Sequence, residues 1–333
     1  MLCPYCLNYV TFNQGKNENI CPKCKQEVPT IYVQDTKTKR VTVSAVGFSG
    51  HGKTVCFASL FYFSDRLSDF WPDFSYMALD DRSMRIIREN SNSLSIGILP
   101  PPTPNNFPIP AIINFMKIPL FGDRIFLFYD IGGESVESMK NIATYASFIK
   151  NSRMMTFFIS LSDLNEKIKE SGVSIGGEMR NLLNAYIGGH SRIEGKAKSQ
   201  DLLVVFTKGD RLKDILPKDV WEYIRSGASE IYGDDNEFSN NDMLRHIKQM
   251  KSISNSLQNF ADKKLNGRVF INLAKNYFKN VNFMVVSSLG TEPAGGKVSP
   301  IPKRVEDILL WLAYSQETNT FTKIKMKLRD KFI

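Results

Sequence analysis

A glycine-rich segment constrains the fold of this chain more than any other feature of its sequence. Residues 41–46 (VTVSAV) are mostly β-branched or apolar, which is typical of a buried strand. They lead into GFSGHGKT at residues 47–54, a full match to G-x-x-x-x-G-K-[ST], and then into a helix-competent stretch at residues 55–63. A phosphate-binding loop requires this order of strand, loop and helix, so we expect an α/β domain that binds a nucleotide.

The residue types of this loop suit it to bind phosphate. Its glycines allow backbone N–H groups to converge on phosphate oxygens, and the N-terminus of the following helix adds partial positive charge. We expect Lys53 to reach the β- and γ-phosphates and the Thr54 hydroxyl to ligate Mg²⁺. His51 lies either near the γ-phosphate or, as we favour, in the loop as a bystander. The residues expected to contact the nucleotide here are Gly47, Ser49, Gly50, His51, Gly52, Lys53, Thr54 and Val55.

A second motif follows a predicted hairpin. Residues 112–121 and 124–131 are expected to form its strands, and the second strand runs into DIGGE at residues 130–134. A carboxylate at the C-terminal end of a strand, here Asp130, can hold Mg²⁺ through water. Asp130 and Gly133 have the D-x-x-G spacing in which the glycine N–H senses a γ-phosphate. Gly133 and Lys53 are therefore candidate catalytic residues.

A third motif points to guanine as the base. Residues 202–206 (LLVVF) predict a buried strand, and TKGD at residues 207–210 matches [NT]-K-x-D. Asp210 can accept hydrogen bonds from both N1–H and the 2-amino group of guanine, donors that adenine lacks, and the stem of Lys208 would pack over the base. A fourth motif follows a strand predicted at residues 282–286, where backbone N–H groups would lie near guanine O6. The base-contacting residues of these two motifs are Thr207, Lys208, Asp210, Ser287, Ser288 and Leu289.

Each of the four motifs follows an apolar strand. Ligands bind at the edge where the carboxyl ends of parallel strands meet, so we expect GTP or GDP and Mg²⁺ at one edge of a sheet. We expect that sheet to be mostly parallel, with one antiparallel edge hairpin and helices on its faces. Further predicted elements are a strand at residues 154–160, helices near residues 176–187 and 242–265, and a closing helix at residues 302–314.

The cysteines predict a separate metal-binding module. Four of the five cysteines form two C-x-x-C pairs: Cys3 with Cys6, and Cys21 with Cys24. Two such pairs can aim four thiolates at one tetrahedral Zn²⁺, and about thirty residues need that metal to fold. A redox-active pair or an accidental match are the alternatives. The module resembles a zinc ribbon, whose role could be to bind nucleic acid, to bind a protein or to cap a domain. Cys56, on the helix after the phosphate loop, is expected to be a small buried residue.

With these motifs in this order, residues 40–315 resemble the translation-factor-related (TRAFAC) clade of P-loop GTPases, which contains the Ras-like proteins. The LPPPTP segment at residues 99–104 and the preceding ribbon look like bacterial double-GTPase-type proteins, found in multi-gene systems thought to act in conflict or phage defence. The resemblance implies a switch in which GTP and Mg²⁺ hold two segments that hydrolysis releases. It also implies a threonine in the first segment that ligates Mg²⁺. Thr103 is our candidate, and a simple turn residue is the alternative.

The chain departs from the clade after the D-x-x-G glycine. Glu134 stands where many members have a glutamine that orients the attacking water. Glutamate could still accept a hydrogen bond from that water, but its charge would lie close to the γ-phosphate. We therefore expect slow intrinsic turnover, with an activating partner or self-association supplying missing groups. No arginine finger can be assigned, because the spacing of Arg82, Arg85 and Arg88 also suits an ordinary helix face.

The expected organisation is a zinc ribbon at residues 1–30, a linker at 31–39, a GTPase domain at 40–316 and a basic strand or tail at 317–333. Residues 211–280 are expected to be a helical elaboration within the GTPase domain. The net charge of +9 fits a nucleotide, a nucleic acid or an anionic surface as partner, or a basic solvated surface. Three functions stay open: a hydrolysing switch, a nucleotide-gated module with little hydrolysis, and nucleic-acid binding. With no apolar run of ~18 residues and no visible signal peptide, we expect a cytoplasmic protein without a membrane span.

Overall fold

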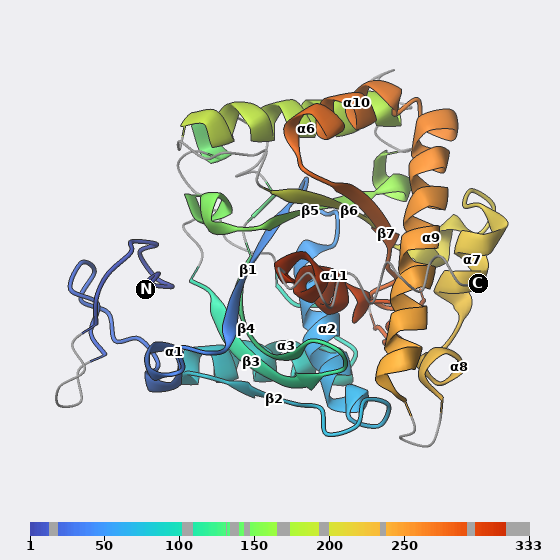
Figure 1. Ribbon diagram of the computed structural model, residues 1–333. Helices are drawn as coiled ribbons and strands as arrows, with labels where there is room; N and C mark the ends of the chain where they lie inside the picture. Colours follow the sequence, from blue (N-terminus) through green and yellow to red (C-terminus); the bar gives the residue numbers. More distant parts are fainter. Residues whose placement is uncertain are drawn as a thin grey trace.

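The computed structural model describes residues 1–12, 19–101, 109–130, 132–133, 140–142, 147–164, 174–192, 200–233, 238–291 and 297–317. In this part of the chain seven strands form one sheet in the order β2-β3-β4-β1-β5-β6-β7. Their bounds are β1 Lys39–Val46, β2 Ser75–Ala78, β3 Ala111–Ile118, β4 Gly122–Tyr129, β5 Met154–Ser160, β6 Asp201–Thr207 and β7 Val281–Val285. The sheet runs through the centre of the molecule (Figure 1).

The sheet is mostly parallel, as expected. Strand β1 pairs in parallel with β4 and β5, and the parallel order continues through β6 to β7. Strand β3 is antiparallel to β4, which confirms the predicted hairpin. Strand β2, which the sequence did not indicate, adds a second antiparallel pairing at that edge. The α/β fold predicted from the motifs is therefore confirmed, with one additional edge strand.

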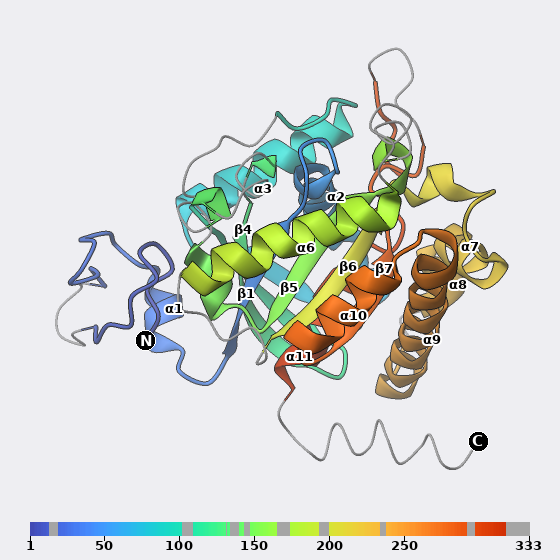
Figure 2. The same cartoon turned by 90° about the horizontal axis from the view of Figure 1, so that it is seen from above.

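Helices cover both faces of the sheet. Helices α6 and α10 lie side by side over one face, while α2 packs against α3, and α11 contacts β1 on the other face (Figures 1 and 2). The N-terminal residues lie at one end of the molecule, opposite α7, α8 and α9. The helix bounds are α1 Thr30–Gln34, α2 Lys53–Leu67, α3 Asp81–Ser95, α6 Ile175–Arg192, α7 Lys218–Arg225, α8 Ala228–Tyr232, α9 Asn240–Lys264, α10 Arg268–Tyr277 and α11 Asp307–Gln316.

The predicted helices form, and local chemistry sets their ends. Helix α9 begins after Ser239, whose hydroxyl caps its first turn while Asp242 reaches back to the Ser239 backbone. The closing helix α11 begins at Asp307, later than the sequence predicted. Arg304 has a left-handed φ of 63°, and Lys303 pairs with Ser287 as an isolated bridge, so this stretch is not helical. Helix α1 spans the predicted boundary between ribbon and linker, and Pro29 precedes its first residue.

A buried polar cluster ties the helical region after β6 to the segment that precedes α11. His246 of α9 lies 2.8 Å from Asp307, and the Tyr223 hydroxyl of α7 donates to the other oxygen of that carboxylate. The Arg304 guanidinium donates to the Tyr223 carbonyl at 3.2 Å and pairs with Glu306 at 3.5 Å. All five side chains are almost completely buried. Helices α7 and α9 are thus fixed to the start of α11 through specific hydrogen bonds.

A second buried charge cluster closes the edge of the sheet opposite the phosphate loop. The Glu317 carboxylate, which follows α11, accepts from Arg124 of β4 at 2.6 Å and from Lys39 of β1 at 2.8 Å. The Arg124 and Glu317 side chains are 8% and 7% exposed, so this pair is shielded from water. Of the basic strand or tail predicted at residues 317–333, residues 318–333 lie outside the described residues.

We expect Glu317→Gln to lower stability at neutral pH by about 2–3 kcal/mol, because it leaves the buried Arg124 charge without its counter-ion. Burial alone would raise the pKa of Glu317, but the hydrogen bond and charge of Lys39, together with Arg124, hold this pKa below its usual value. The stabilisation is therefore complete above the unfolded pKa of about 4.3 and is lost as the pH falls through the folded pKa.

Urea unfolding from pH 7 down to pH 3 measures this effect. The variant should show less acid destabilisation than the wild type. Glu222→Gln is the control, since Glu222 pairs with Lys218 at 3.8 Å on the surface and should cost no more than about 0.5 kcal/mol. Equal losses in both variants would contradict the assignment.

Candidate functional site

The phosphate loop follows β1 and ends at the first residue of α2. Gly50 and Gly52 have φ values of 78° and 80°, a left-handed region that favours glycine. At Gly47 an added Cβ would lie 2.5 Å from the Phe158 carbonyl oxygen of β5. Gly52 precedes α2 and offers no side chain to cap its first turn. The N-terminus of a fifteen-residue helix therefore opens towards the loop, as an anion site requires.

A cavity of about 310 Å³ lies against this loop. The Lys53 ammonium group is held there by the carbonyl oxygens of Gly47 and Phe48, at 2.7 and 3.0 Å. The cavity also brings the start of the predicted first switch segment, Pro100 and Pro101, next to the loop. Its lining residues are Ser49, Gly50, Gly52, Lys53, Thr54, Val55, Pro100, Pro101, Gly132 and Gly133.

The second motif meets the phosphate loop at two points. The Thr54 hydroxyl donates to the Asp130 carboxylate at 2.8 Å, so two of the three residues predicted to hold Mg²⁺ lie together. Gly133 packs against the backbone of the loop so closely that an added Cβ would lie 2.2 Å from the Ser49 nitrogen. Only a residue without a side chain fits there. Hydroxyl and carboxylate oxygens are the donors that Mg²⁺ prefers, so the chemistry of the Thr54–Asp130 pair suits the ion.

The third motif is bonded to the phosphate loop. The Thr207 hydroxyl, at the end of β6, donates to the His51 carbonyl oxygen at 2.9 Å. Gly209 is packed against the end of β7, where an added Cβ would lie 2.9 Å from the Val285 side chain and 3.1 Å from the Val286 carbonyl oxygen. The first and third residues of TKGD are thus fixed, one to the phosphate loop and the other to the neighbouring strand.

A second cavity, of about 210 Å³, adjoins the first and shares Gly50, Gly52 and Val55 with it. Asp210 lies in its wall, with one carboxylate oxygen accepting from the Ser287 hydroxyl, which in turn accepts from the Gly290 N–H at 3.0 Å. The third and fourth motifs therefore meet at a single cavity. Its remaining lining residues are Leu99, Thr207, Lys208, Arg211, Ser288, Leu289 and Thr291.

Lys208 has a partner that the sequence did not indicate. Its ammonium group lies 2.5 Å from the Asp163 carboxylate, in the segment that follows β5. Burial alone would raise the pKa of Asp163, but the hydrogen bond and charge of Lys208 hold it below the usual value. Lys208 also has a left-handed φ of 55°. The only local signal for Asp163 was its place just beyond the carboxyl end of a predicted strand.

His51 does not line either of the two cavities, and its ring is bonded to the sheet instead. Its Nδ1 accepts a hydrogen bond from the Ser160 N–H at 3.2 Å, at the end of β5. Burial lowers the pKa of His51 to about 4, so the ring is neutral at physiological pH and can act as an acceptor. His51 therefore joins the loop to β5 through its side chain and to β6 through its carbonyl oxygen.

Two of the expected catalytic residues, Thr103 and Glu134, lie outside the described residues. Arg82, Arg85 and Arg88 are exposed on α3, which agrees with the ordinary helix face that the sequence favoured. Cys56 is completely buried, as expected.

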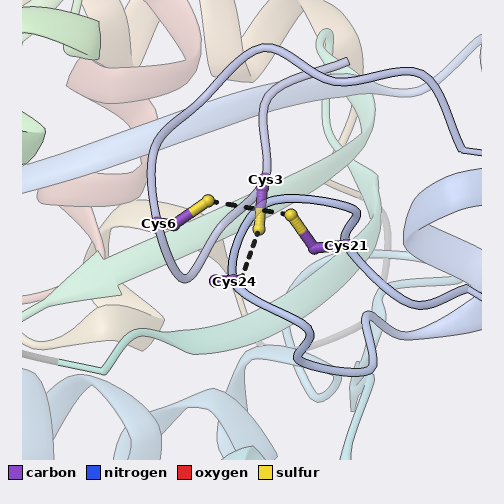
Figure 3. A group of neighbouring side chains, drawn as sticks. All are labelled: Cys3, Cys6, Cys21 and Cys24. Atoms are coloured by element: carbon purple, nitrogen blue, oxygen red, sulfur yellow. Dashed lines mark hydrogen bonds between the residues drawn. The ribbon is translucent and has the colours of Figure 1, made fainter.

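The four N-terminal cysteines form a cluster whose sulfur atoms all lie within 4.8 Å of one another (Figure 3). The Cys3 and Cys24 sulfurs are 3.8 Å apart, and the Cys6 and Cys21 sulfurs are 3.7 Å apart. A tetrahedral Zn²⁺ with Zn–S bonds of about 2.3 Å requires sulfur atoms about 3.8 Å apart, whereas a disulfide requires about 2.05 Å. The donor set and its spacing therefore fit structural zinc.

The two cysteine pairs sit in turns of the same shape, which we call the first and second knuckles (residues 2–9 and 20–27). In the first, Leu7 N–H donates to the Cys3 carbonyl, and Leu7 has a φ of 58°. In the second, Lys25 N–H donates to the Cys21 carbonyl, and Lys25 has a φ of 60°. Burial would raise the pKa of Cys21, but backbone N–H groups of Cys24 and Lys23 lower it to about 7, whereas burial raises the pKa of Cys3 and of Cys24.

No protein-family model matches this chain, and no curated protein matches it. Among solved structures it is similar to Sup35 complexed with GDP, at 13% identity and a TM-score of 0.30, over 80% of this chain and 41% of that chain. It is also similar to Sup35 complexed with GMPPNP, at 14% identity and a TM-score of 0.30, over 88% and 48%. The likeness is distant, and this chain spans less than half the length of those chains.

None of the helices in the described ranges combines the length and the apolar character that crossing a bilayer requires.

We expect the purified chain to carry one zinc ion, measured by mass spectrometry of the native protein and by metal analysis. Cys21→Ser should abolish stoichiometric zinc and expose the first thirty residues to protease, because so few residues cannot fold without the metal. Cys56→Ala is the control and should retain zinc, since Cys56 lies on α2 outside the cluster. Retention of zinc by Cys21→Ser would contradict a four-cysteine site.

Proposed function

We propose that this protein is a Mg²⁺-dependent switch that binds and slowly hydrolyses GTP. The observation that carries the proposal is the pair of adjoining cavities with a common floor of Gly50, Gly52 and Val55. One cavity contains the groups that recognise phosphate, and the other contains those that recognise a base. A nucleoside triphosphate has the same layout, with its charged phosphates at one end and its planar base at the other.

Guanine is the base that the second cavity favours. The Asp210 carboxylate can only accept hydrogen bonds. The Ser287 hydroxyl, which donates to one of its oxygens, orients it. Guanine offers two adjacent donors to such a group, whereas adenine would leave a carboxylate oxygen desolvated without a donor. A partly buried charged acceptor that receives no hydrogen bond lowers the affinity for the ligand severalfold or more. ATP would therefore bind more weakly than GTP.

The first cavity accounts for the phosphates and the ion. Lys53 now donates to two loop carbonyl oxygens, and phosphate oxygens would be stronger acceptors for the same ammonium group. The Thr54 hydroxyl and the Asp130 carboxylate would hold Mg²⁺, Asp130 through water. When bound, the ion neutralises charge on the β- and γ-phosphates. These roles use the residues that the sequence motifs singled out.

The close packing of Gly133 supports a switching role. Gly133 lies directly against the Ser49 backbone at the edge of the phosphate cavity. A third phosphate at this end of the loop would have to share that space, so GTP and GDP would favour different positions of the segment that begins at Gly133. A protein effector or a second copy of the chain could read that difference. The role in bacterial conflict or phage defence stays a prediction of the sequence resemblance, as does nucleic-acid binding.

We expect the full chain to bind GTP and GDP with Mg²⁺ and to bind ATP at least about tenfold more weakly, measured by calorimetry. Asp210→Asn should reduce GTP affinity about tenfold or more, since hydrogen bonds to a charged group contribute about 1.5–3 kcal/mol. The same variant should gain affinity for xanthosine triphosphate, whose 2-carbonyl can accept from the asparagine amide.

Asp214→Asn is the matched control, because Asp214 is exposed four positions further along the chain. A preference for ATP, or equal losses of GTP affinity in the two variants, would overturn the assignment of the base.

Hydrolysis is tested by single-turnover phosphate release. We expect slow release from the wild-type chain and none from Lys53→Ala. Glu134→Gln should raise the rate by about tenfold, because it removes a negative charge expected close to the γ-phosphate. A lower rate in Glu134→Gln would instead indicate that the Glu134 carboxylate assists hydrolysis. Tight binding with no phosphate release from either protein would favour a binding module over a hydrolase.

A further inference from the structure

The first knuckle is bonded directly to the strand that carries the predicted Mg²⁺ ligand. The Tyr129 hydroxyl, at the end of β4, donates to the Pro4 carbonyl oxygen at 2.5 Å. Pro4 lies between the metal-binding residues Cys3 and Cys6, and Tyr129 immediately precedes Asp130. One hydrogen bond thus separates the zinc cluster from the residue next to the Thr54–Asp130 pair.

The Tyr129 ring is held so firmly that it cannot move independently of β4. It is completely buried and stacks flat on Phe148, with ring centres 4.7 Å apart and an angle of 5° between the planes. In the sheet Tyr129 is paired with Ser44 of β1, shortly before the phosphate loop begins. A change in the position of Pro4 would therefore be passed to the C-terminal end of β4.

A second bond links the same knuckle to the N-terminus of α3. The Tyr5 hydroxyl donates to Asp80 at 2.8 Å, while the other oxygen of that carboxylate caps the first turn of α3 through the Ser83 N–H at 2.6 Å. Helix α3 ends at Ser95, and the chain then runs to Pro100 and Pro101 in the cavity wall. The first knuckle is thus bonded both to the end of β4 and to the start of the helix that precedes Pro100.

Among the residues that the structure describes, the first knuckle makes such contacts and the second does not. Pro4 is buried and Tyr5 is half-buried, whereas the corresponding residues of the second knuckle, Pro22 and Lys23, are exposed. The metal fixes the shape of the C-x-x-C turn through the sulfurs of Cys3 and Cys6. The shape that zinc imposes is therefore the shape that Tyr129 and Asp80 contact.

We propose that Tyr129 is a positioning residue for Asp130, anchored by the zinc-held first knuckle, so that zinc binding and Mg²⁺–nucleotide binding are energetically coupled. This inference rests on the proposed function. Coupling between two binding sites is reciprocal, so zinc should raise the affinity for the Mg²⁺–nucleotide, and the Mg²⁺–nucleotide should raise the affinity for zinc by the same factor.

The test compares Tyr129→Phe with Tyr32→Phe in the full chain. The Tyr32 hydroxyl also donates to a carbonyl oxygen of the first knuckle, that of Leu2, at 2.8 Å, and Tyr32 is also completely buried. It lies on α1 rather than beside Asp130. The two variants lose the same kind of hydrogen bond to the same module, and only one of those bonds leads to the predicted Mg²⁺ site.

We expect Tyr129→Phe to weaken binding of a non-hydrolysable GTP analogue about fivefold or more when Mg²⁺ is present, and to leave binding unchanged in buffer from which Mg²⁺ is omitted and to which no chelator is added, so that zinc stays bound. Tyr32→Phe should behave as wild type in both conditions. Equal losses in both variants, or a loss in Tyr129→Phe that is the same without Mg²⁺, would show a structural role alone and overturn the proposal.

A second measurement follows zinc. At equilibrium, a competing chromogenic chelator should take less zinc from the wild-type chain when the Mg²⁺–analogue is bound, and this effect should shrink in Tyr129→Phe but not in Tyr32→Phe. No effect of a bound analogue on the zinc affinity of the wild-type chain overturns the coupling while leaving the proposed function intact. Failure of the wild-type chain to bind the analogue at all overturns both.

Discussion

The hydrogen bond from the Thr207 hydroxyl to the His51 carbonyl oxygen is the contact on which the arrangement of the candidate site depends. Strands β1 and β6 are separated by β5, so the loops that follow them can meet only beyond the edge of the sheet. The His51 ring adds a bond to the end of β5. Three neighbouring strands are thereby tied to one residue of the phosphate loop, and the two cavities on either side of it keep a fixed separation.

The parts of the site that could be predicted are those that local chemistry encodes. A loop that wraps phosphate needs glycines where φ is positive or space is absent, as at Gly52 and Gly133. Strands buried on both faces, such as β5 and β6, are continuous apolar runs that a sequence shows plainly. The residues after such strands gather at one edge for topological reasons. The four motifs, which are far apart in the sequence, are therefore close together in the structure.

The parts that could not be predicted depend on contacts between distant residues. Strand β2 has only four residues, with no buried one among them, and it exists because β3 offers a free edge. Lys208 pairs with Asp163, which is distant in the sequence. The late start of α11 follows from the left-handed conformation of Arg304. Nothing near Tyr129 in the sequence indicates a bond to Pro4. Such features require the fold itself, because no periodicity or spacing carries them.

The matching turns of the two knuckles have a consequence for how this module can diverge. Each turn holds two of the four cysteines in the same backbone geometry. In the part of the chain that the structure describes, however, only the first turn is hydrogen-bonded to β4 and to the start of α3. Sequence drift at Pro22 or Lys23 therefore leaves the docking contacts untouched so long as Cys21 and Cys24 persist. The second knuckle can therefore acquire a new binding role, while the residues of the first knuckle that contact β4 and α3 stay under constraint.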